Sequence, residues 1–152
     1  MKRIISLTLC LVFTFSFMSC NKKTDDASSD NSYKIALITT NETKTQNCNF
    51  NNVHDACKQY DTENSQKFRN YIPNDFKNTS IVASIDNAIL DGFNVLTFIG
   101  DEYIGAVSSV ATQNHGIVFI IFCASAEIAL HSNIYCCPAG EDYYKFICSV
   151  LG

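Results

Sequence analysis

The sequence predicts an α/β fold in which a parallel sheet has helices on both faces, and two observations support it. Continuous apolar runs, typical of strands buried on both sides, alternate with segments whose apolar residues recur every three or four positions, as in helices. Strands that alternate with helices form parallel sheets through right-handed crossovers. The chain has 152 residues, of which 47% are hydrophobic and 17% charged. That composition indicates a globular protein with one domain.

Residues 1–19 are predicted to be an export signal. Lys2 and Arg3 give the segment a positive start, and an apolar run follows over residues 4–18. A run of that length suits a signal sequence better than a membrane span.

The stretch FMSC, which ends at Cys20, resembles the bacterial lipobox. In lipoproteins this cysteine becomes lipid-modified and forms the mature N-terminus. The alternative is a plain cleaved signal with a chance cysteine. The lipidated Cys20 and a flexible tether are expected over residues 20–32, because residues 21–32 contain no large apolar side chain. Residues 33–152 are expected to form the α/β lobe, and the protein to be anchored to a bacterial membrane, facing the periplasm or the exterior.

The charge balance argues against nucleic-acid binding. The chain has 11 basic and 15 acidic residues, and loss of Lys2 and Arg3 leaves 9 against 15, a net charge of −6. The remaining basic residues are scattered singly, so no basic stripe is available for a phosphate backbone.

Six cysteines remain once Cys10 and Cys20 are set aside. No CxxC pair is present and the three histidines lie far apart, so the sequence predicts no zinc site and no cofactor. Most of these cysteines are expected to be plain core residues. A bridge between Cys48 and Cys57 stays open. The adjacent Cys136 and Cys137 are expected on opposite faces of a strand.

The first half of the lobe is expected to contain two strands and one helix. Residues 34–40 form the first buried strand, and residues 41–49 a polar loop. A helix follows, and residues 61–69 are polar and expected at the surface. A short second strand is predicted over residues 71–73. The apolar face of the helix consists of Phe50, Val53, Cys57 and Tyr60.

The next segments repeat the alternation. A helix is predicted over residues 79–91 and ends at Gly92, which suits a left-handed C-terminal position. A buried strand over residues 94–99 stops at Gly100. Asp101 and Glu102 then open another helix, where carboxylates complement the positive end of the dipole. The positions expected to face the sheet are Val82, Ile85, Ile89 and Leu90 in the first helix, and Ile104, Val107, Val110 and Ala111 in the second.

The last segments complete the pattern. The strand over residues 117–122 is the most apolar, and a short helix or loop over 124–131 leads to a strand over 134–136. The final helix is predicted over residues 141–150. Its inward side chains are expected to be Tyr144, Ile147, Cys148 and Leu151. The loop after the first strand contains no glycine, which excludes the glycine-rich phosphate sites of dinucleotide-binding and P-loop proteins.

Several stretches of the lobe are similar, in the same order, to motifs of one known family. AILDGFNVLTFIG is similar to A-x-x-x-G-[YF]-x-V-[IL]…G, and NCNFNN at residues 47–52 to D-x-S-F-N-Q. The other matching stretches are YKIALITT and residues 53–60, 71–73, 117–122, 133–135 and 141–152. Together they resemble the basic membrane protein family of substrate-binding lipoproteins, which includes purine nucleoside-binding lipoproteins.

This resemblance implies a type I periplasmic-binding-protein fold that delivers nucleosides to the permease of an ABC transporter. The sequence departs from the family at three site positions: Asn47 replaces an Asp, Asp101 replaces an aromatic residue, and Cys123 replaces an Asp. A full member has two lobes with the ligand between them. The chain is therefore expected to be an N-terminal lobe only, with weak ligand binding and an exposed apolar patch.

Four residues are candidates for ligand contact, because ligands of open α/β sheets bind beyond the carboxyl ends of the strands. Phe50 either stacks on a nucleobase or packs the first helix onto the sheet. Asn47 either hydrogen-bonds a ribose hydroxyl or base edge, or caps a helix. Asp101 either accepts from sugar hydroxyls or is a solvated first-turn carboxylate. Tyr103 either lines the cleft or covers the sheet edge.

No catalytic constellation is visible, so the chain is not expected to be an enzyme. Asp101 and Glu102 are neighbours that diverge, and no nucleophile-elbow motif is present. The expected function is a membrane-anchored solute-binding lipoprotein with a purine nucleoside as ligand. The alternative is a lipoprotein remnant without a transport role, which acts as a surface antigen or interaction module.

Overall fold

The structure is a computed structural model that describes residues 32–64, 67–125 and 131–152. The chain divides into the units Met1–Asn31 and Ser32–Gly152. The predicted export signal, Cys20 and the tether up to residue 31 lie outside the described residues. Within the described part of the chain, no helix has the length and apolar character needed to cross a membrane.

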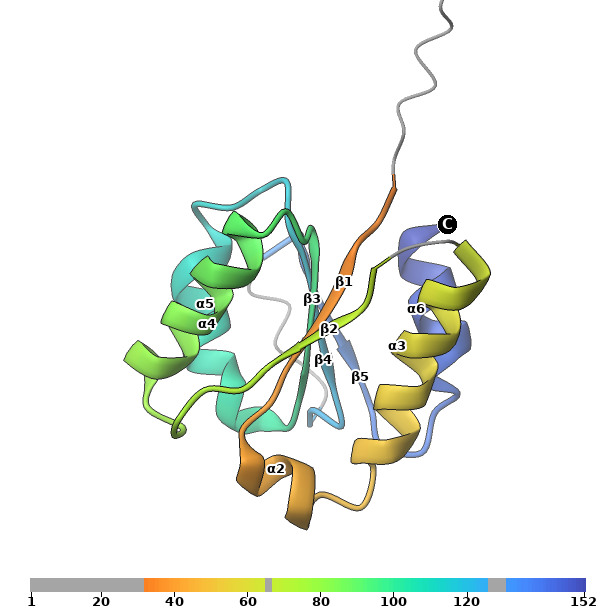
Figure 1. Ribbon diagram of the computed structural model, residues 1–152, viewed down its shortest axis with the longest axis horizontal. Helices are drawn as coiled ribbons and strands as arrows, with labels where there is room; N and C mark the ends of the chain where they lie inside the picture. The colour runs from red at the N-terminus through yellow and green to blue at the C-terminus, as the bar shows by residue number, and fades with distance from the viewer. Residues whose placement is uncertain (1–31, 65–66, 126–130) are drawn as a thin grey trace, which may run out of the picture. The chain divides into compact units, whose positions relative to one another are not determined.

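Five parallel strands form a single sheet with the order β2-β1-β3-β4-β5, which confirms the predicted α/β class (Figure 1). The pairing of β3 with β4 extends over the whole of both strands, from Val95 opposite Val118 to Ile99 opposite Phe122. The strands are β1 (Ile35–Ile38), β2 (Arg69–Tyr71), β3 (Val95–Ile99), β4 (Val118–Phe122) and β5 (Ile134–Cys137).

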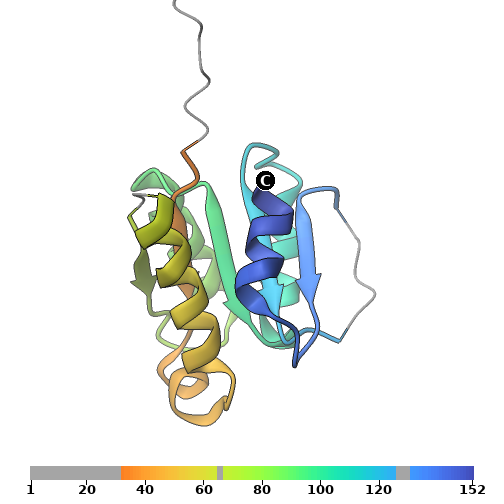
Figure 2. The same cartoon turned by 90° about the vertical axis from the view of Figure 1, so that its right-hand side faces the viewer.

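Helices cover both faces of the sheet. One face carries α3 (Phe50–Asn64) and α6 (Tyr143–Leu151), and the other carries α4 (Asn78–Leu90) and α5 (Ile104–Ala111). Figures 1 and 2 show these two layers on either side of the strands. Two short helices lie at the carboxyl ends of the strands: α2 (Asn41–Gln46) and the 3-10 turn η1 (Asp101–Tyr103).

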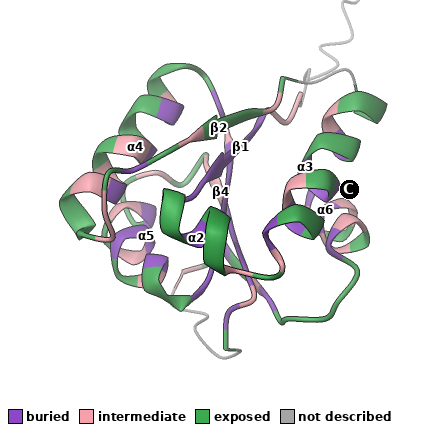
Figure 3. Ribbon diagram, turned by 60° about the horizontal axis from the view of Figure 1, so that its bottom comes forward, coloured by how far each residue is buried: buried purple, intermediate pink, exposed green. Residues whose placement is uncertain are grey.

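The three central strands, β1, β3 and β4, are almost entirely apolar because both of their faces are buried, whereas the edge strand β2 is polar and largely exposed. Ile35 and Leu37 point toward α3 and α6, whereas Ala36 and Ile38 point toward α4 and α5. Figure 3 shows the buried strands enclosed by helices whose outer surfaces are exposed. Two separate hydrophobic cores therefore share one sheet, as expected for parallel strands that cannot face water.

The polar segment after β1 differs from the prediction, because residues 41–46 form α2 rather than a loop. The side chain of Thr40 accepts a hydrogen bond from the Thr43 backbone N–H at 3.1 Å and so caps this helix. Polar composition indicated a loop here, but a short helix needs only a cap and a buried contact.

Two further boundaries moved. α3 continues to Asn64, so part of the segment 61–69 is helical, and β2 begins at Arg69 rather than at residue 71. Gly92 has a φ of 84°, which confirms the left-handed residue predicted after α4.

The predicted inner faces of two helices need correction. In α4 the buried residues are Ile81, Ile85 and Ala88, and Leu90 is 83% exposed. Spacings of four and three residues place these three on one stripe, and Leu90 falls outside it at the last turn. In α6 the buried aromatic residue is Tyr143 rather than Tyr144.

Most of the six cysteines were expected in the core, but only Cys57 and Cys137 are buried, and the half-buried Cys123, Cys136 and Cys148 pack against the cores. Cys136 packs on the α4/α5 side of the sheet and Cys137 on the α3/α6 side, as predicted for neighbours on a strand. Cys48 is exposed and Cys57 is buried, and both are free thiols. The Cys57 thiol lies 3.7 Å from the Thr97 hydroxyl, so it packs against β3 rather than reaching Cys48.

Candidate functional site

The candidate site lies where the strand order reverses. β1 pairs with β2 on one side and with β3 on the other. The connection after β1 leads to β2 and the connection after β3 leads to β4, so the chain leaves β1 and β3 in opposite directions. In open α/β sheets, including those with the order 2-1-3-4-5, ligands bind in the crevice that forms at this point beyond the carboxyl ends. Here the crevice is bordered by α2, which follows β1, and by η1, which follows β3.

Tyr103 ties the two sides of the crevice together. Its hydroxyl accepts a hydrogen bond from the Thr40 backbone N–H at 2.9 Å and lies 3.0 Å from the Thr43 hydroxyl. All three residues are buried, and burial raises the pKa of Tyr103. The hydroxyl therefore stays protonated and holds α2 against the end of β3.

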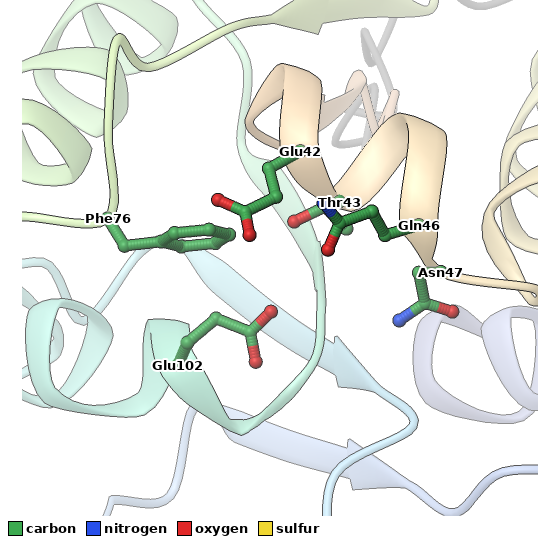
Figure 4. Close-up of a pocket in the computed structure, with 6 residues that line it drawn as sticks. All are labelled: Glu42, Thr43, Gln46, Asn47, Phe76 and Glu102. Atoms are coloured by element: carbon green, nitrogen blue, oxygen red, sulfur yellow. The ribbon is translucent and has the colours of Figure 1, made fainter.

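A cavity of about 280 Å³ opens in this crevice. Figure 4 shows the carboxylates of Glu42 and Glu102 turned toward the same space, with the Phe76 ring beside Glu42. Phe76 is held by an edge-to-face contact with Tyr103, with ring centroids 5.8 Å apart. The residues that line the cavity are Glu42, Thr43, Gln46, Asn47, Phe76 and Glu102.

The cavity carries negative charge. None of the ion pairs found in the described part of the chain includes Glu42 or Glu102. Carboxylates accept hydrogen bonds from hydroxyl and amino groups, and they repel phosphates. The site is therefore suited to a ligand rich in hydrogen-bond donors and poor in negative charge.

Gly100 is required beside Glu102. It has a φ of 108°, and a Cβ atom at this position would overlap the Glu102 carboxylate. Only glycine adopts this conformation at low cost, and a side chain here would displace the flexible Glu102 carboxylate from its position. The sharp end of β3 thus allows Glu102 to fold over the strand end toward the cavity.

Asn47 and Phe50 are the two predicted ligand-contact residues in the segment that follows β1. Asn47 lines the cavity, but its Oδ1 accepts from the Asn49 backbone N–H at 2.9 Å, and it ends α2 rather than capping α3. Phe50 is only 6% exposed and lies within the α3/α6 core, where it stacks on His54 with centroids 5.7 Å apart. Ligand contact by Asn47 and Phe50 stays a prediction.

Asp101 and Tyr103 are the two predicted ligand-contact residues in the segment that follows β3. The Asp101 carboxylate accepts from the Ser125 backbone N–H at 2.9 Å and from its hydroxyl at 2.5 Å, which joins the ends of β3 and β4. Tyr103 is fully buried, and its hydroxyl holds the start of α2 through the Thr40 backbone N–H. Both side chains are engaged within the protein, and their roles toward a ligand also stay predictions.

Sequence reasoning missed Glu42, Phe76 and Glu102, which the tertiary structure brings together from three separate connections. Two signals were available. Glu42 and Gln46 are four residues apart, which places them on one side of a helix, and Phe76 is a single aromatic residue in a polar loop. Neither signal shows that these residues meet.

Within residues 32–64, 67–125 and 131–152, no group of three or more His, Cys, Asp or Glu side chains is arranged to hold a metal ion. Another hollow, of about 540 Å³, lies at the opposite, amino end of the sheet. The cavity beside α2 is the one that lies at the strand-order reversal.

No protein-family model matches the chain, and no curated protein matches it in sequence. Solved structures do match. A fragment of a candidate lipoprotein from Peptoclostridium difficile 630 aligns with a TM-score of 0.66 and 14% identity, over 78% of this chain and 95% of that chain. A transcriptional activator of the comK gene from Bacillus halodurans aligns with a TM-score of 0.55 and 11% identity, over 68% of this chain and 33% of that chain.

These likenesses show the fold alone. The lobe has the Rossmann-like α/β fold that it shares with a candidate lipoprotein. None of the comparisons supports the basic membrane protein family or a nucleoside ligand in particular, so both stay predictions.

Proposed function

We propose that the chain is a lipid-anchored solute-binding protein of a bacterial membrane, whose cavity between the ends of β1 and β3 takes a nucleoside-type ligand for an ABC transporter permease. The observation that carries the proposal is the convergence of Glu42, Glu102 and Phe76 at the strand-order reversal.

The chemistry of a purine nucleoside suits these three side chains. Its ribose hydroxyls and amino group donate hydrogen bonds, which the carboxylates of Glu42 and Glu102 accept. The Phe76 ring offers a face or edge to the base, and such a contact is worth about 0.5–1.5 kcal/mol beyond burial. The negative field of the two carboxylates favours the free nucleoside over its phosphorylated forms.

The size of the cavity implies modest affinity. Its volume of about 280 Å³ falls near the lower end of ligand pockets, and tight sites bury most of the ligand. A ligand held on one side only keeps its other side in water. We therefore expect dissociation constants above the micromolar range for this chain by itself.

The membrane anchor is proposed on the lipobox-like FMSC stretch that ends at Cys20. The structural similarity to a candidate lipoprotein from Peptoclostridium difficile supports it. Cys20→Ser should abolish acylation, which the intact mass of the mature chain measures. If the mature wild-type chain has no more mass than its amino acids account for, it carries no lipid, and the anchor drops out of the proposal.

A thermal melt of the mature chain tests the ligand. Millimolar adenosine, guanosine, inosine and cytidine are added separately, and binding to the folded state raises the melting temperature by linkage. We expect a shift with the purine nucleosides that is lost in Glu42→Gln/Glu102→Gln. The matched variant Asp86→Asn/Glu141→Gln makes the same charge change outside the cavity and should keep the shift. A cooperative melt without any shift contradicts the proposed ligand.

One observation favours a second function, a lipoprotein without a transport role that acts as a surface antigen or interaction module. The polar atoms of Asn47 and Asp101, which correspond to ligand-contact positions of the resembled family, make hydrogen bonds within the protein. Absence of any nucleoside-dependent shift, together with confirmed acylation, would favour this function.

A further inference from the structure

The amino end of the sheet carries a basic hollow on the side opposite the cavity. Its volume is about 540 Å³, the largest hollow described on this lobe. Three cations border it, Lys34 before β1 and Lys67 and Arg69 at the start of β2, together with the carboxylates of Asp61 and Asp91. This grouping is not visible in the sequence, because the three cations lie in two separate segments.

Internal pairing accounts for only part of this charge. Arg69 lies 2.5 Å from the Asp91 carboxylate, which also accepts from the Tyr71 hydroxyl at 2.6 Å. None of the ion pairs in the described part of the chain includes Lys34 or Lys67. Asp61 is therefore the one remaining carboxylate of the hollow that opposes these two lysines, and the hollow keeps a net positive charge.

This positive charge stands out against an acidic chain. Residues 32–152 contain 7 basic and 12 acidic side chains. The opposite end carries the acidic cavity with Glu42 and Glu102. The two hollows therefore carry opposite charge, and an anionic surface attracts the basic hollow and repels the acidic cavity.

The chain enters the lobe at the same end. The Lys34 backbone N–H donates to Asn94 Oδ1 at 2.7 Å, and Asn94 Nδ2 donates to the Ser32 carbonyl at 3.4 Å. The 12 residues from Asn21 to Ser32 separate this point from Cys20. Even fully extended they span at most roughly 40 Å, so a lipid on Cys20 keeps the amino end of the lobe within that reach of the bilayer.

We propose that Lys34, Lys67 and Arg69 bind the phosphate headgroups of an anionic bilayer, so that the lobe rests on the membrane by its amino end and the cavity faces away from it. The closeness of the bilayer rests on the lipid anchor of the proposed function. The orientation keeps the cavity open to solutes and to a partner that approaches from outside. It also gives weak cationic contacts an effect, because the anchor makes docking an intramolecular event.

Hydrogen exchange of the acylated mature chain in vesicles tests the orientation. The chain is reconstituted in phosphatidylglycerol vesicles and in phosphatidylcholine vesicles, with intact mass as the measure of acylation. We expect severalfold slower exchange over residues 67–69 and 91–94 in the anionic vesicles only. Residues 41–46 of α2, at the opposite end, should exchange equally in both. Raised salt should remove the difference, because it screens charges beyond a few ångströms.

Matched variants separate the site from net charge. Lys34→Gln/Lys67→Gln should reduce the docked population by roughly 25-fold, at about fivefold for each cation near an anionic surface. Lys44→Gln/Lys77→Gln makes the same charge change at the carboxyl end and should retain the protection. Equal exchange in both lipids, or equal loss in both variants, overturns the proposal.

Two further arms distinguish the sources of failure. If millimolar glycerol phosphate protects the same residues of unacylated chain as strongly as the anionic vesicles protect the acylated chain, the hollow takes a soluble anion and the membrane proposal is wrong. If the mass shows no lipid, the proposed anchor fails, and an N-terminal His tag on a nickel-chelating lipid then holds the chain on both kinds of vesicle for the same exchange measurement. Protection in the anionic vesicles that depends on Lys34 and Lys67 supports the hollow, and its absence overturns it.

Discussion

Removal of one buried hydroxyl, in Tyr103→Phe, should loosen the wall of the cavity without emptying the core. The Tyr103 hydroxyl accepts from the Thr40 backbone N–H at 2.9 Å and bonds the Thr43 hydroxyl at 3.0 Å. The ring keeps its contacts with Phe76 and Phe98 in the variant. The change therefore isolates the hydrogen bonds that join the two sides of the crevice.

The expected loss of unfolding free energy in Tyr103→Phe follows from the burial of the partners of its hydroxyl. Thr40 and Thr43 are 3% and 4% exposed, so water cannot replace the lost partner. A buried donor left unsatisfied costs about 1–3 kcal/mol, and we take about 2 kcal/mol. Unfolding entropy near 2.1 cal/mol/K per residue amounts to roughly 0.25 kcal/mol/K for a lobe of about 120 residues. The melting temperature should then fall by about 8 °C.

Calorimetry of the mature chain measures this shift, and Tyr144→Phe is the control. Tyr144 donates to the Glu63 carboxylate at an exposed position, where water takes over the lost bond, so its loss should change the melting temperature by only a degree or two. Tyr103→Phe should also weaken nucleoside binding, because α2 is no longer held. A melting temperature equal to that of the wild type, or an equal fall in both variants, would refute the reasoning.

Four other variants probe the cores and the end of β3. Burial raises the pKa of Cys57 from 9.0 to about 12, so the folded state keeps a proton that the unfolded chain loses. This stabilisation is present below about pH 9 and is lost as the pH rises toward 12. Cys57→Ala should flatten the decline of the unfolding free energy with pH, measured in urea titrations, by up to about 1.4 kcal/mol per pH unit. Identical slopes in the wild type and the variant would contradict this prediction. Ile85→Ala should lower the free energy of denaturant unfolding by about 2–5 kcal/mol, whereas Leu90→Ala should change it by no more than about 0.5 kcal/mol. The reverse order would mean that Leu90, and not Ile85, lies on the buried face of α4. Gly100→Ala should cost about 1–3 kcal/mol from its φ of 108° and weaken nucleoside binding by displacing Glu102, so unchanged affinity in calorimetric titration would separate Glu102 from the ligand.

The polar segments were the hardest to predict from sequence. A helix of six residues after β1 has no apolar period to reveal it, and its support comes from Thr40 and from Tyr103, which lies about 60 residues further along the chain. The inner face of α4 was misjudged at Leu90 for a related reason. Apolar character places a residue near a core, but only the helix phase against the sheet decides whether it enters.

Local chemistry, which a sequence contains, determined the kinds of element and their alternation. Apolar runs long enough for a strand and closed by glycine or polar residues specified the buried strands, and Gly92 marked the end of α4. The α/β class followed, because strands buried on both sides need helices on both faces. The predicted export signal and the lipobox-like stretch also rest on the sequence alone.

Only the tertiary structure decided the strand order, and with it the two ends of the lobe. Because β1 lies between β2 and β3, Glu42, Phe76 and Glu102 meet at one end, and Lys34, Lys67 and Arg69 meet at the other. Apart from the near neighbours Lys67 and Arg69, each residue is separated from its partners by whole helices or strands. Periodicity describes how a segment faces a core, whereas neighbours across a sheet depend on which strands pair, and that choice is made by the packing of the complete chain.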